Sequence, residues 1–283
     1  MKRKRIFSTI AVLPMYLFTL MFVLGPLVMM LLLSFLRQDG WSYALSFTWD
    51  NYTGLFTEQY FSVFKTSLGL ACLSTALVIL LGYPFGLTAA LSPDRARRFF
   101  VSAQMIPYWV NSLLRLYGWI IIFRANGLLD KVLMFFGLIE EPLKLLYTYP
   151  AVVVGMVYAL LPFMILSVYS SVEKMDWTLV EAARDLGAGA CRAFLTVTLK
   201  LTLPGLLTGI ILTFVPSMGL FFIADILGGN KIVLVGTVIQ EQLMKVHNWP
   251  FAAALAVVLM AMTGSLIALY RKITGAKQLE NML

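Results

Sequence analysis

The chain has 283 residues, of which 60% are hydrophobic and only 13% are charged, and its mean hydropathy is +0.85. Soluble domains carry about 25% charged residues. The composition therefore excludes an ordinary soluble domain and predicts a polytopic membrane protein.

Six apolar stretches are long enough to cross the hydrocarbon core of a bilayer, which takes about 20 residues. We expect all six to be helices, because a helix satisfies its own backbone hydrogen bonds in lipid. They run roughly over 10–36, 66–91, 99–123, 150–170, 201–223 and 250–270. The first follows the basic sequence MKRKR, but it is too long for the core of a signal peptide and no small-x-small cleavage site follows, so we expect a retained helix. The predicted fold class is an all-α polytopic membrane protein with six transmembrane helices.

The loops on one side of the membrane carry most of the basic residues, and this bias predicts the orientation. That side holds 14 of the 22 Lys and Arg residues and 6 of the 14 acids, which accounts for the whole net charge of +8. The basic residues are Lys2, Arg3, Lys4, Arg5, Arg95, Arg97, Arg98, Lys174, Arg184, Arg192, Lys200, Arg271, Lys272 and Lys277. This side is predicted to be cytoplasmic, with both termini on it. The positive charge then reflects topology, and no nucleic-acid partner is expected.

This topology predicts three segments. Residues 1–65 form an N-terminal cytoplasmic stub, the first transmembrane helix and an outer loop. Residues 66–273 form a transmembrane core that includes a cytoplasmic loop at 171–200, and residues 274–283 form a cytoplasmic tail. The first outer loop is rich in aromatic residues, which is typical of a belt at the membrane interface.

Motifs for catalysis by this chain are missing from the sequence. There is no G-x-x-x-x-G-K-[ST] phosphate loop, no H-E-x-x-H and no G-x-S-x-G. Cys72 lies in a predicted span and Cys191 in a loop, so no disulfide is expected, and His247 has no clustered ligand for a metal. We expect a non-catalytic chain without a cofactor or metal of its own, so any nucleotide must be bound by a partner.

The loop 171–200 contains a sequence typical of a capped, water-exposed helix, TLVEAARDLGAG. Thr178 and Glu181 have the spacing of a capping box. Gly187 is at the position where a helix ends in the left-handed conformation. A second short helix is expected over roughly 190–199, which gives a pair of short helices on the cytoplasmic surface. The simplest alternative is a surface helix that merely joins two spans.

This loop resembles the EAA motif of permease subunits from binding-protein-dependent ABC importers, the MetI-like type I permeases. Glu181, Ala182, Ala183 and Gly187 match the motif, and Val197 and Leu199 match its apolar end. The resemblance implies that the loop forms coupling helices, which dock into a groove on a cytoplasmic ATPase subunit; Asp185 is included among the expected coupling residues. One departure is that the family pattern closes with Leu-Pro, whereas Lys200 follows Leu199 and the next proline is Pro204.

A wider resemblance covers about residues 50 to 255. It is carried by the stretches NYTGLF, GYPFGL, IPYWVNSLLRLYGW, VYALLPFMILSVYSSVEKMD, EAARDLGA, GLFFIADILGG and NWPFAAA. Together they are similar to the PotB-type permeases of spermidine/putrescine importers. The resemblance implies a bacterial inner-membrane subunit that pairs with a second, PotC-type permease, ABC ATPase subunits that bind ATP and Mg, and an extracytoplasmic polyamine-binding protein.

A polyamine pathway should offer carboxylates and aromatic faces to a polycation, and ionisable residues at membrane depth are candidates for such a role. Asp225 is the first candidate, with Phe221 and Phe222 beside it; the alternative is an acid at a helix end that faces water. Arg115 would repel a polycation, so it is expected to be structural, with Asn111 one turn earlier and Asp225 or backbone carbonyls as its partner. The further candidates for the pathway are Trp109, Tyr117, Tyr158 and Glu241.

Two other functions are compatible with the sequence. The chain could be the permease of an ABC importer for another small solute. It could also be a secondary carrier or channel driven by an ion gradient, which would transport without any ATPase.

Overall fold

The computed structural model describes residues 13–40 and 42–274, and these fall into two compact units. The first unit comprises Met1–Ser62 and Val238–Ala268, and the second comprises Val63–Thr237 and Leu269–Leu283. Among the described residues, five helices are long and apolar enough to span a membrane: Leu13–Leu33, Glu58–Leu91, Tyr149–Glu173, Ala190–Gly219 and Trp249–Tyr270. The helical membrane fold is thus confirmed. The basic cluster at 2–5 and the predicted tail from residue 275 onward lie outside the described residues.

The third predicted span, 99–123, is helical but broken. It consists of α5 (Asp94–Met105), a 3₁₀ turn η3 (Ile106–Trp109) and α6 (Ser112–Phe123). Pro107 removes a backbone donor, and the Asn111 side chain accepts a hydrogen bond from the Leu113 N–H at 2.8 Å, which starts a new helix. A helix of 12 residues is about 18 Å long, shorter than the roughly 30 Å hydrocarbon core, so neither piece alone is a full span.

The first unit contains the described part of the first span, a small hairpin and most of the last span. The π-helical η1 (Leu20–Leu24) continues into α2 (Gly25–Leu33), and β1 (Leu36–Asp39) pairs antiparallel with β2 (Ser42–Phe47). Next come α3 (Asp50–Thr53) and η2 (Gly54–Phe56), and later in the chain η5 (Gln242–Val246) and α14 (Trp249–Thr274). The hairpin is the one departure from an all-helical fold among the described residues.

Asn51 ties the end of the first span to α3. Its buried amide donates to the carbonyl oxygens of Ser34 at 2.9 Å and Leu36 at 2.8 Å. The neighbouring Tyr52 hydroxyl lies 2.7 Å from the Ser34 hydroxyl. The NYTGLF stretch therefore fixes how the chain leaves the first span.

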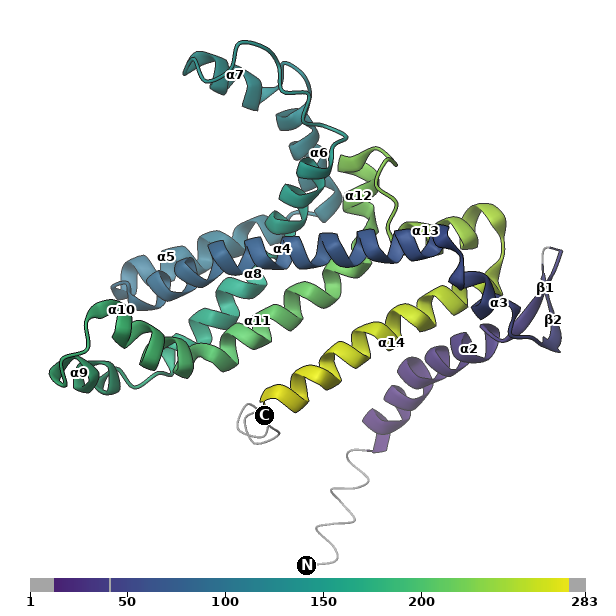
Figure 1. The fold of residues 1–283 in the computed structure, drawn as a ribbon, viewed down its shortest axis with the longest axis horizontal. Coiled ribbons are helices and arrows are strands. Elements are labelled where there is room, and N and C mark those ends of the chain that lie inside the picture. The colour runs from purple at the N-terminus through teal and green to yellow at the C-terminus, as the bar shows by residue number, and fades with distance from the viewer. Residues whose placement is uncertain (1–12, 41, 275–283) are drawn as a thin grey trace, which may run out of the picture. The chain divides into compact units, whose positions relative to one another are not determined.

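The second unit is built around α8 (Tyr149–Glu173), which packs along α11 (Leu199–Gly219) (Figure 1). The close approach depends on glycines of two neighbouring helices. A Cβ at Gly86 of α4 (Glu58–Leu91) would lie 2.9 Å from the Ile165 carbonyl oxygen, and one at Gly205 would lie 2.3 Å from the Ser171 Cβ. Gly82 and Gly209, each four residues away, meet Met164 in the same way. Both helices thus use the small-xxx-small spacing that lets membrane helices approach closely.

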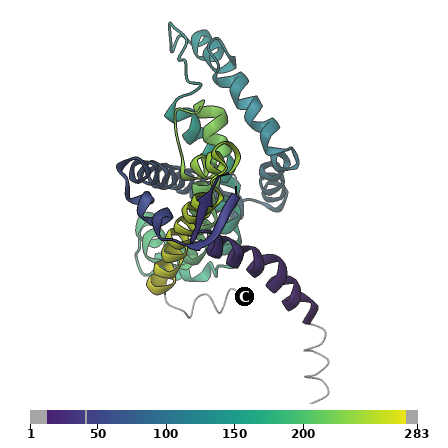
Figure 2. The ribbon, with the colours of Figure 1, turned by 90° about the vertical axis from the view of Figure 1, so that its right-hand side faces the viewer.

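The rest of this unit forms the end opposite to α9 (Thr178–Asp185). It contains α7 (Leu128–Phe135), α12 (Phe221–Gly228) and the start of α13 (Val235–Glu241), of which the residues from Val238 onward belong to the first unit. The α7 helix follows α6 at the extremity (Figure 2). Asp130 of α7 is buried and its carboxylate accepts the N–H groups of Asn126 at 2.9 Å and Leu143 at 3.2 Å. This carboxylate closes the loop between α6 and α8.

Candidate functional site

The α9 helix is capped two residues earlier than the sequence predicts. Its cap is the carboxylate of Asp176, which accepts hydrogen bonds from the Thr178 N–H at 3.0 Å and the Thr178 hydroxyl at 2.8 Å. Trp177 already has helical angles, φ −71° and ψ −19°. The predicted capping box of Thr178 and Glu181 is therefore wrong, because Thr178 lies inside the helix, where its hydroxyl donates to Asp176.

The end of α9 is as predicted. Gly187 has φ +87°, a conformation that glycine adopts without strain. Its N–H donates to the Arg184 carbonyl at 2.9 Å, and the Ala188 N–H donates to the Ala183 carbonyl at 3.0 Å. These two bonds form a Schellman motif. Both ends of this short helix are thus fixed by hydrogen bonds.

One face of α9 packs inward. Val180 is 6% exposed, and with Arg184 it lines a hollow of about 140 Å³. The other residues of this hollow come from α4, from the approach to α9 and from the next helix: Leu87, Leu91, Trp177, Ala190, Ala193, Phe194 and Thr198. These contacts hold α9 against the spans.

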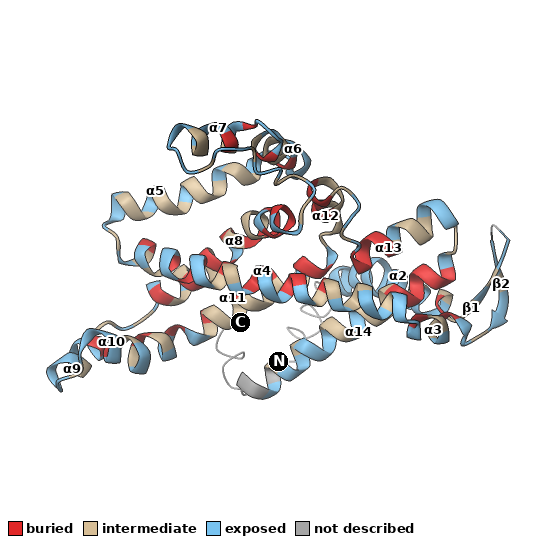
Figure 3. Cartoon of the chain, turned by 45° about the horizontal axis from the view of Figure 1, so that its top comes forward, coloured by how far each residue is buried: buried red, intermediate tan, exposed pale blue. Residues whose placement is uncertain are grey.

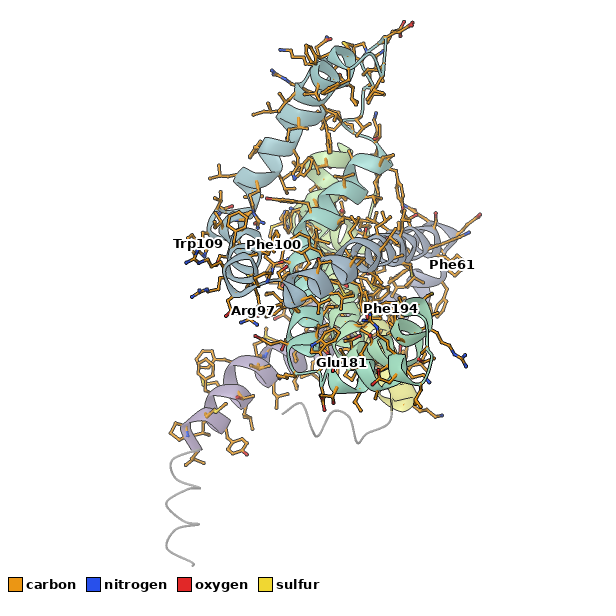
Figure 4. All side chains as sticks on the ribbon, turned by 90° about the vertical axis from the view of Figure 1, so that its left-hand side faces the viewer. Phe61, Arg97, Phe100, Trp109, Glu181 and Phe194 are labelled. Atoms are coloured by element: carbon orange, nitrogen blue, oxygen red, sulfur yellow. The ribbon has the colours of Figure 1, made fainter. Side chains whose placement is uncertain are left out.

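The opposite face of α9 is exposed (Figure 3). Glu181, Ala182 and Asp185 are exposed, Ala183 is half-buried, and Leu186 just past the helix is 90% exposed. Figure 4 labels Glu181 on α9 and Phe194 on the following helix. The structure thus brings the expected coupling residues together on one short helix, with an apolar side chain at its end.

The second helix of the loop is continuous with the next span. The segments α10 (Ala190–Ala193), π-helical η4 (Phe194–Thr198) and α11 form one helix from Ala190 to Gly219. The expected separate helix over 190–199 is therefore wrong. Lys200 has a backbone N–H and therefore fits a continuous helix at the position where the family pattern has proline.

An open groove lies beside the contact between α8 and α11. Its lining is rich in hydroxyl groups and includes one base and one acid: Ser167, Ser170, Ser171, Lys174, Met175, Asp176, Leu179, Leu201, Pro204, Gly205 and Thr208. Gly205, the small residue that lets α11 approach α8, is also part of this lining.

Asp225 lies on α12 and its partner is a hydroxyl. The Thr237 hydroxyl donates to the Asp225 carboxylate at 2.9 Å. Phe221 and Phe222 precede it on the same helix, with ring centroids 6.4 Å apart, and the Phe221 ring packs over the backbone of Gly236. The structure therefore carries the acid and both aromatic residues on α12, with Asp225 and Phe221 in contact with α13.

Arg115 faces tyrosine rings. Its guanidinium carbon lies 4.5 Å from the ring centroid of Tyr108 and 5.7 Å from that of Tyr158, distances at which a cation is attracted to an aromatic face. Asp225 binds Thr237, and within the described residues Nε and Nη1 of Arg115 have no hydrogen-bond partner. The considered Arg115–Asp225 pair is not formed in this structure.

The other predicted residues are dispersed. Trp109 and Tyr117 are exposed on η3 and α6, and Asn111 between them is the cap of α6. Tyr158 packs edge-on against Trp119, with ring centroids 5.4 Å apart. Glu241 forms an ion pair with Lys245 at 2.8 Å.

Sequence reasoning missed the contacts that depend on distant partners. The buried hydroxyls of Tyr83 and Thr202 lie 2.8 Å apart although 119 positions separate them. The Gly-x-x-x-Gly spacings at 82–86 and 205–209 are visible in the sequence and could have predicted the packing of α4 and α11 on α8.

Comparisons with known proteins agree with this architecture. Residues 82–272 match the family described as binding-protein-dependent transport system inner membrane component. The spermidine/putrescine transport system permease protein PotB of Escherichia coli (strain K12) is 40% identical over 88% of this chain and 91% of its own length. PotB of Haemophilus influenzae (strain ATCC 51907 / DSM 11121 / KW20 / Rd) is 40% identical over 93% of both chains.

Solved structures share the fold. A chain in the crystal structure of a bacterial alginate ABC transporter in complex with an alginate pentasaccharide-bound periplasmic protein has a TM-score of 0.74. It is 15% identical, and the alignment covers 96% of this chain and 95% of that one. The chain belongs to the binding-protein-dependent transport system inner membrane components and, within them, to the PotB-type permeases.

Proposed function

We propose that this permease subunit imports polyamines, spermidine and putrescine, in an ATP-driven transporter, and that α9 is the helix on which a partner ATPase docks. The observation that carries the docking role is a short helix fixed at both ends whose inner face is packed and whose outer face is open. Rigid ends mean that a force on α9 displaces the helix rather than unwinding it. A loop that merely joined two spans would need neither the Asp176 cap nor the turn at Gly187.

The outer face of α9 fits a protein partner. Leu186 offers an apolar side chain that is 90% exposed, and Glu181 and Asp185 place carboxylates beside it. An apolar contact surrounded by charged residues is typical of the centre and rim of a protein interface. The partner ATPase supplies ATP and Mg²⁺ chemistry that this chain has no motif to provide.

The proposed pathway for the cation starts at α12. Asp225 offers a carboxylate whose known contact is a neutral hydroxyl, so its charge is not cancelled by the Thr237 bond. Phe221 and Phe222 offer aromatic faces on the same helix. Tyr158, Trp109, Tyr117 and Glu241 are secondary candidates. Arg115 and Asn111 serve the structure around the break in the third span, since Asn111 caps α6 and Arg115 faces the rings of Tyr108 in η3 and Tyr158 in α8.

Membership of the family supports a particular assembly. We propose a pair of permeases, this chain with a PotC-type partner in the lipid bilayer of the bacterial inner membrane, together with ABC ATPase subunits and an extracytoplasmic polyamine-binding protein. In this proposal both termini and α9 lie on the cytoplasmic side. Nucleotide binding would draw the ATPases together, and α9 would transmit that movement to the spans.

Co-purification tests the docking role. A tagged chain is expressed with its ATPase and second permease, and Glu181→Lys is compared with Glu140→Lys, a matched charge reversal in the loop between α6 and α8. We expect the ATPase to be lost from Glu181→Lys alone. Retention of the ATPase by Glu181→Lys would refute docking on this face.

Uptake tests the substrate. Labelled spermidine should enter cells that carry the complete transporter, and unlabelled putrescine should compete better than amino acids or sugars. Uptake that persists after deletion of the ATPase would instead support an ion-gradient carrier.

A further inference from the structure

The π-helical segment η4 connects α10, the short helix after α9, to the membrane-spanning α11. In η4 the Leu199 N–H donates to the Phe194 carbonyl, five residues earlier, instead of four. The wider turn weakens the regular ladder of hydrogen bonds, and such segments are frequent at functional sites. Since the helix is otherwise continuous from Ala190 to Pro204, η4 is the place where movement of α10 could be absorbed before it reaches α11.

Tyr83 of α4 contacts the first residue of η4 directly and is linked to the last one through Thr202 of α11. Its ring packs edge-on against Phe194, the first residue of η4, with centroids 6.0 Å apart and an interplanar angle of 77°. Its hydroxyl lies 2.8 Å from the Thr202 hydroxyl, which donates at 2.8 Å to the carbonyl of Thr198, the last residue of η4. A hydroxyl carries one hydrogen. Because the Thr202 hydroxyl donates its hydrogen to the Thr198 carbonyl, the Tyr83 hydroxyl is the donor in its bond to Thr202.

These contacts are shielded from solvent. Tyr83 is 8% exposed and Thr202 is 0% exposed. A hydrogen bond in such surroundings is costly to leave unmade, because neither hydroxyl has water to replace its partner. The relay from Tyr83 through Thr202 to Thr198 therefore fixes the geometry of η4 relative to α4.

The inner face of α9 also lies against Phe194 of η4 and against α4. Val180 and Arg184 share their hollow with Phe194 and with Leu87 and Leu91 of α4, which lie one and two turns beyond Tyr83. A displacement of α9 therefore acts on Phe194 and on α4 at once. Whether α11 follows depends on whether η4 holds its shape.

We propose that Tyr83 and Thr202 are positioning residues for coupling to the ATPase. Their hydrogen bond holds η4 against α4, so that a displacement of α9 and α10 moves α4 and α11 together. Without this hydrogen bond, the backbone of η4 can change its helical geometry, and part of the displacement is then lost before it reaches the spans. This role rests on the proposed function, because it presupposes an ATPase that moves α9.

The test is the amount of solute imported per ATP hydrolysed by the whole transporter in proteoliposomes, with both permeases, the ATPase and the binding protein. The variants are Tyr83→Phe, Thr202→Val and the double variant. Thr213→Val is the matched control, because Thr213 is equally buried in α11 and its hydroxyl donates to the Gly209 and Ile210 carbonyls of its own helix.

We expect the ratio to fall about fivefold in each single variant, the factor that corresponds to one hydrogen bond of about 1 kcal/mol. The double variant should fall no further than Thr202→Val, because that substitution already removes the bond to Tyr83. Thr213→Val should keep the ratio of the unmodified chain. An unchanged ratio in Tyr83→Phe and Thr202→Val would overturn the proposal. If the unmodified transporter showed no ATP-dependent uptake, the proposed function itself would fail.

A second measurement separates lost transmission from lost docking. A fluorophore on the exposed Cys191 of α10, in a Cys72→Ser background, should respond to nucleotide. We expect Tyr83→Phe to keep this response while the ratio falls, because α10 still moves. Loss of the response together with the ratio would place the defect at docking and overturn the role proposed for η4.

Discussion

Replacing Gly205 by alanine should weaken the contact between α8 and α11. The added Cβ would lie 2.3 Å from the Ser171 Cβ and 2.7 Å from the Ser167 carbonyl oxygen. Both of these atoms are fixed to the α8 backbone, so no side-chain rotation relieves the overlap. The two helices must separate by about 1 Å or more to restore ordinary contact distances, an overpacking that typically costs about 1–3 kcal/mol.

Two smaller effects accompany the overlap. The separation stretches the 2.8 Å hydrogen bond from the Ser167 hydroxyl to the Gly205 carbonyl, which contributes about 1 kcal/mol. Alanine gains about 1 kcal/mol over glycine in helix propensity. These two terms roughly cancel, so the steric cost decides the sign, and Gly205→Ala should destabilise the protein by about 1–3 kcal/mol.

Thermal unfolding of the purified transporter in detergent measures this effect. Gly69→Ala is the matched control, because Gly69 lies inside α4 and an added Cβ there meets no atom within 4 Å. We expect Gly205→Ala to unfold at a lower temperature than both the unmodified chain and Gly69→Ala. A melting temperature at or above that of the unmodified chain would refute the packing of α11 on α8 through this glycine.

Three further substitutions test other parts of the account. Asp130→Asn should increase hydrogen exchange in the loop between α6 and α8, because a backbone N–H loses a carboxylate acceptor; Glu141→Gln, exposed in the same loop, should not. Asn51→Leu should make the segment after the first span more sensitive to protease, since two carbonyls lose a buried donor worth about 1–3 kcal/mol each. Asp225→Asn should raise the KM for spermidine about tenfold, as expected for a lost ion contact of roughly 1.4 kcal/mol. Thr237→Val leaves the carboxylate charged and should change the KM less. Equal KM values for Asp225→Asn and the unmodified chain would exclude the cation contact.

The spans could be predicted because apolar length alone determines them. The break in the third span could not, since proline by itself does not decide: α4 and α8 remain continuous through Pro84 and Pro162. Neighbouring helices satisfy the groups that a proline frees in a membrane helix. At Pro107 the chain instead breaks, and the local bond from Leu113 to the Asn111 side chain favours a new start.

The site was predictable where it depends on neighbouring residues and not where it depends on distant ones. Gly187 was recognised because its role follows from the local turn. The predicted cap lies two residues away from the observed one, since Asp176 and Thr178 are both good capping residues and the pattern does not rank them. The Tyr83–Thr202 bond joins two helices far apart in the sequence, so only the packed structure contains it.

Site-directed cross-linking tests the central claim, that α9 carries the ATPase, most directly. Cysteines would be introduced singly at Leu186 beside α9 and at Leu138 in the loop between α6 and α8, two apolar residues that are 90% and 69% exposed. With Cys72 and Cys191 replaced by serine, a short cross-linker applied to the assembled transporter should join Leu186→Cys to the ATPase and leave Leu138→Cys unlinked. A cross-link to the ATPase from Leu138→Cys, with none from Leu186→Cys, would contradict both the docking helix and the predicted orientation.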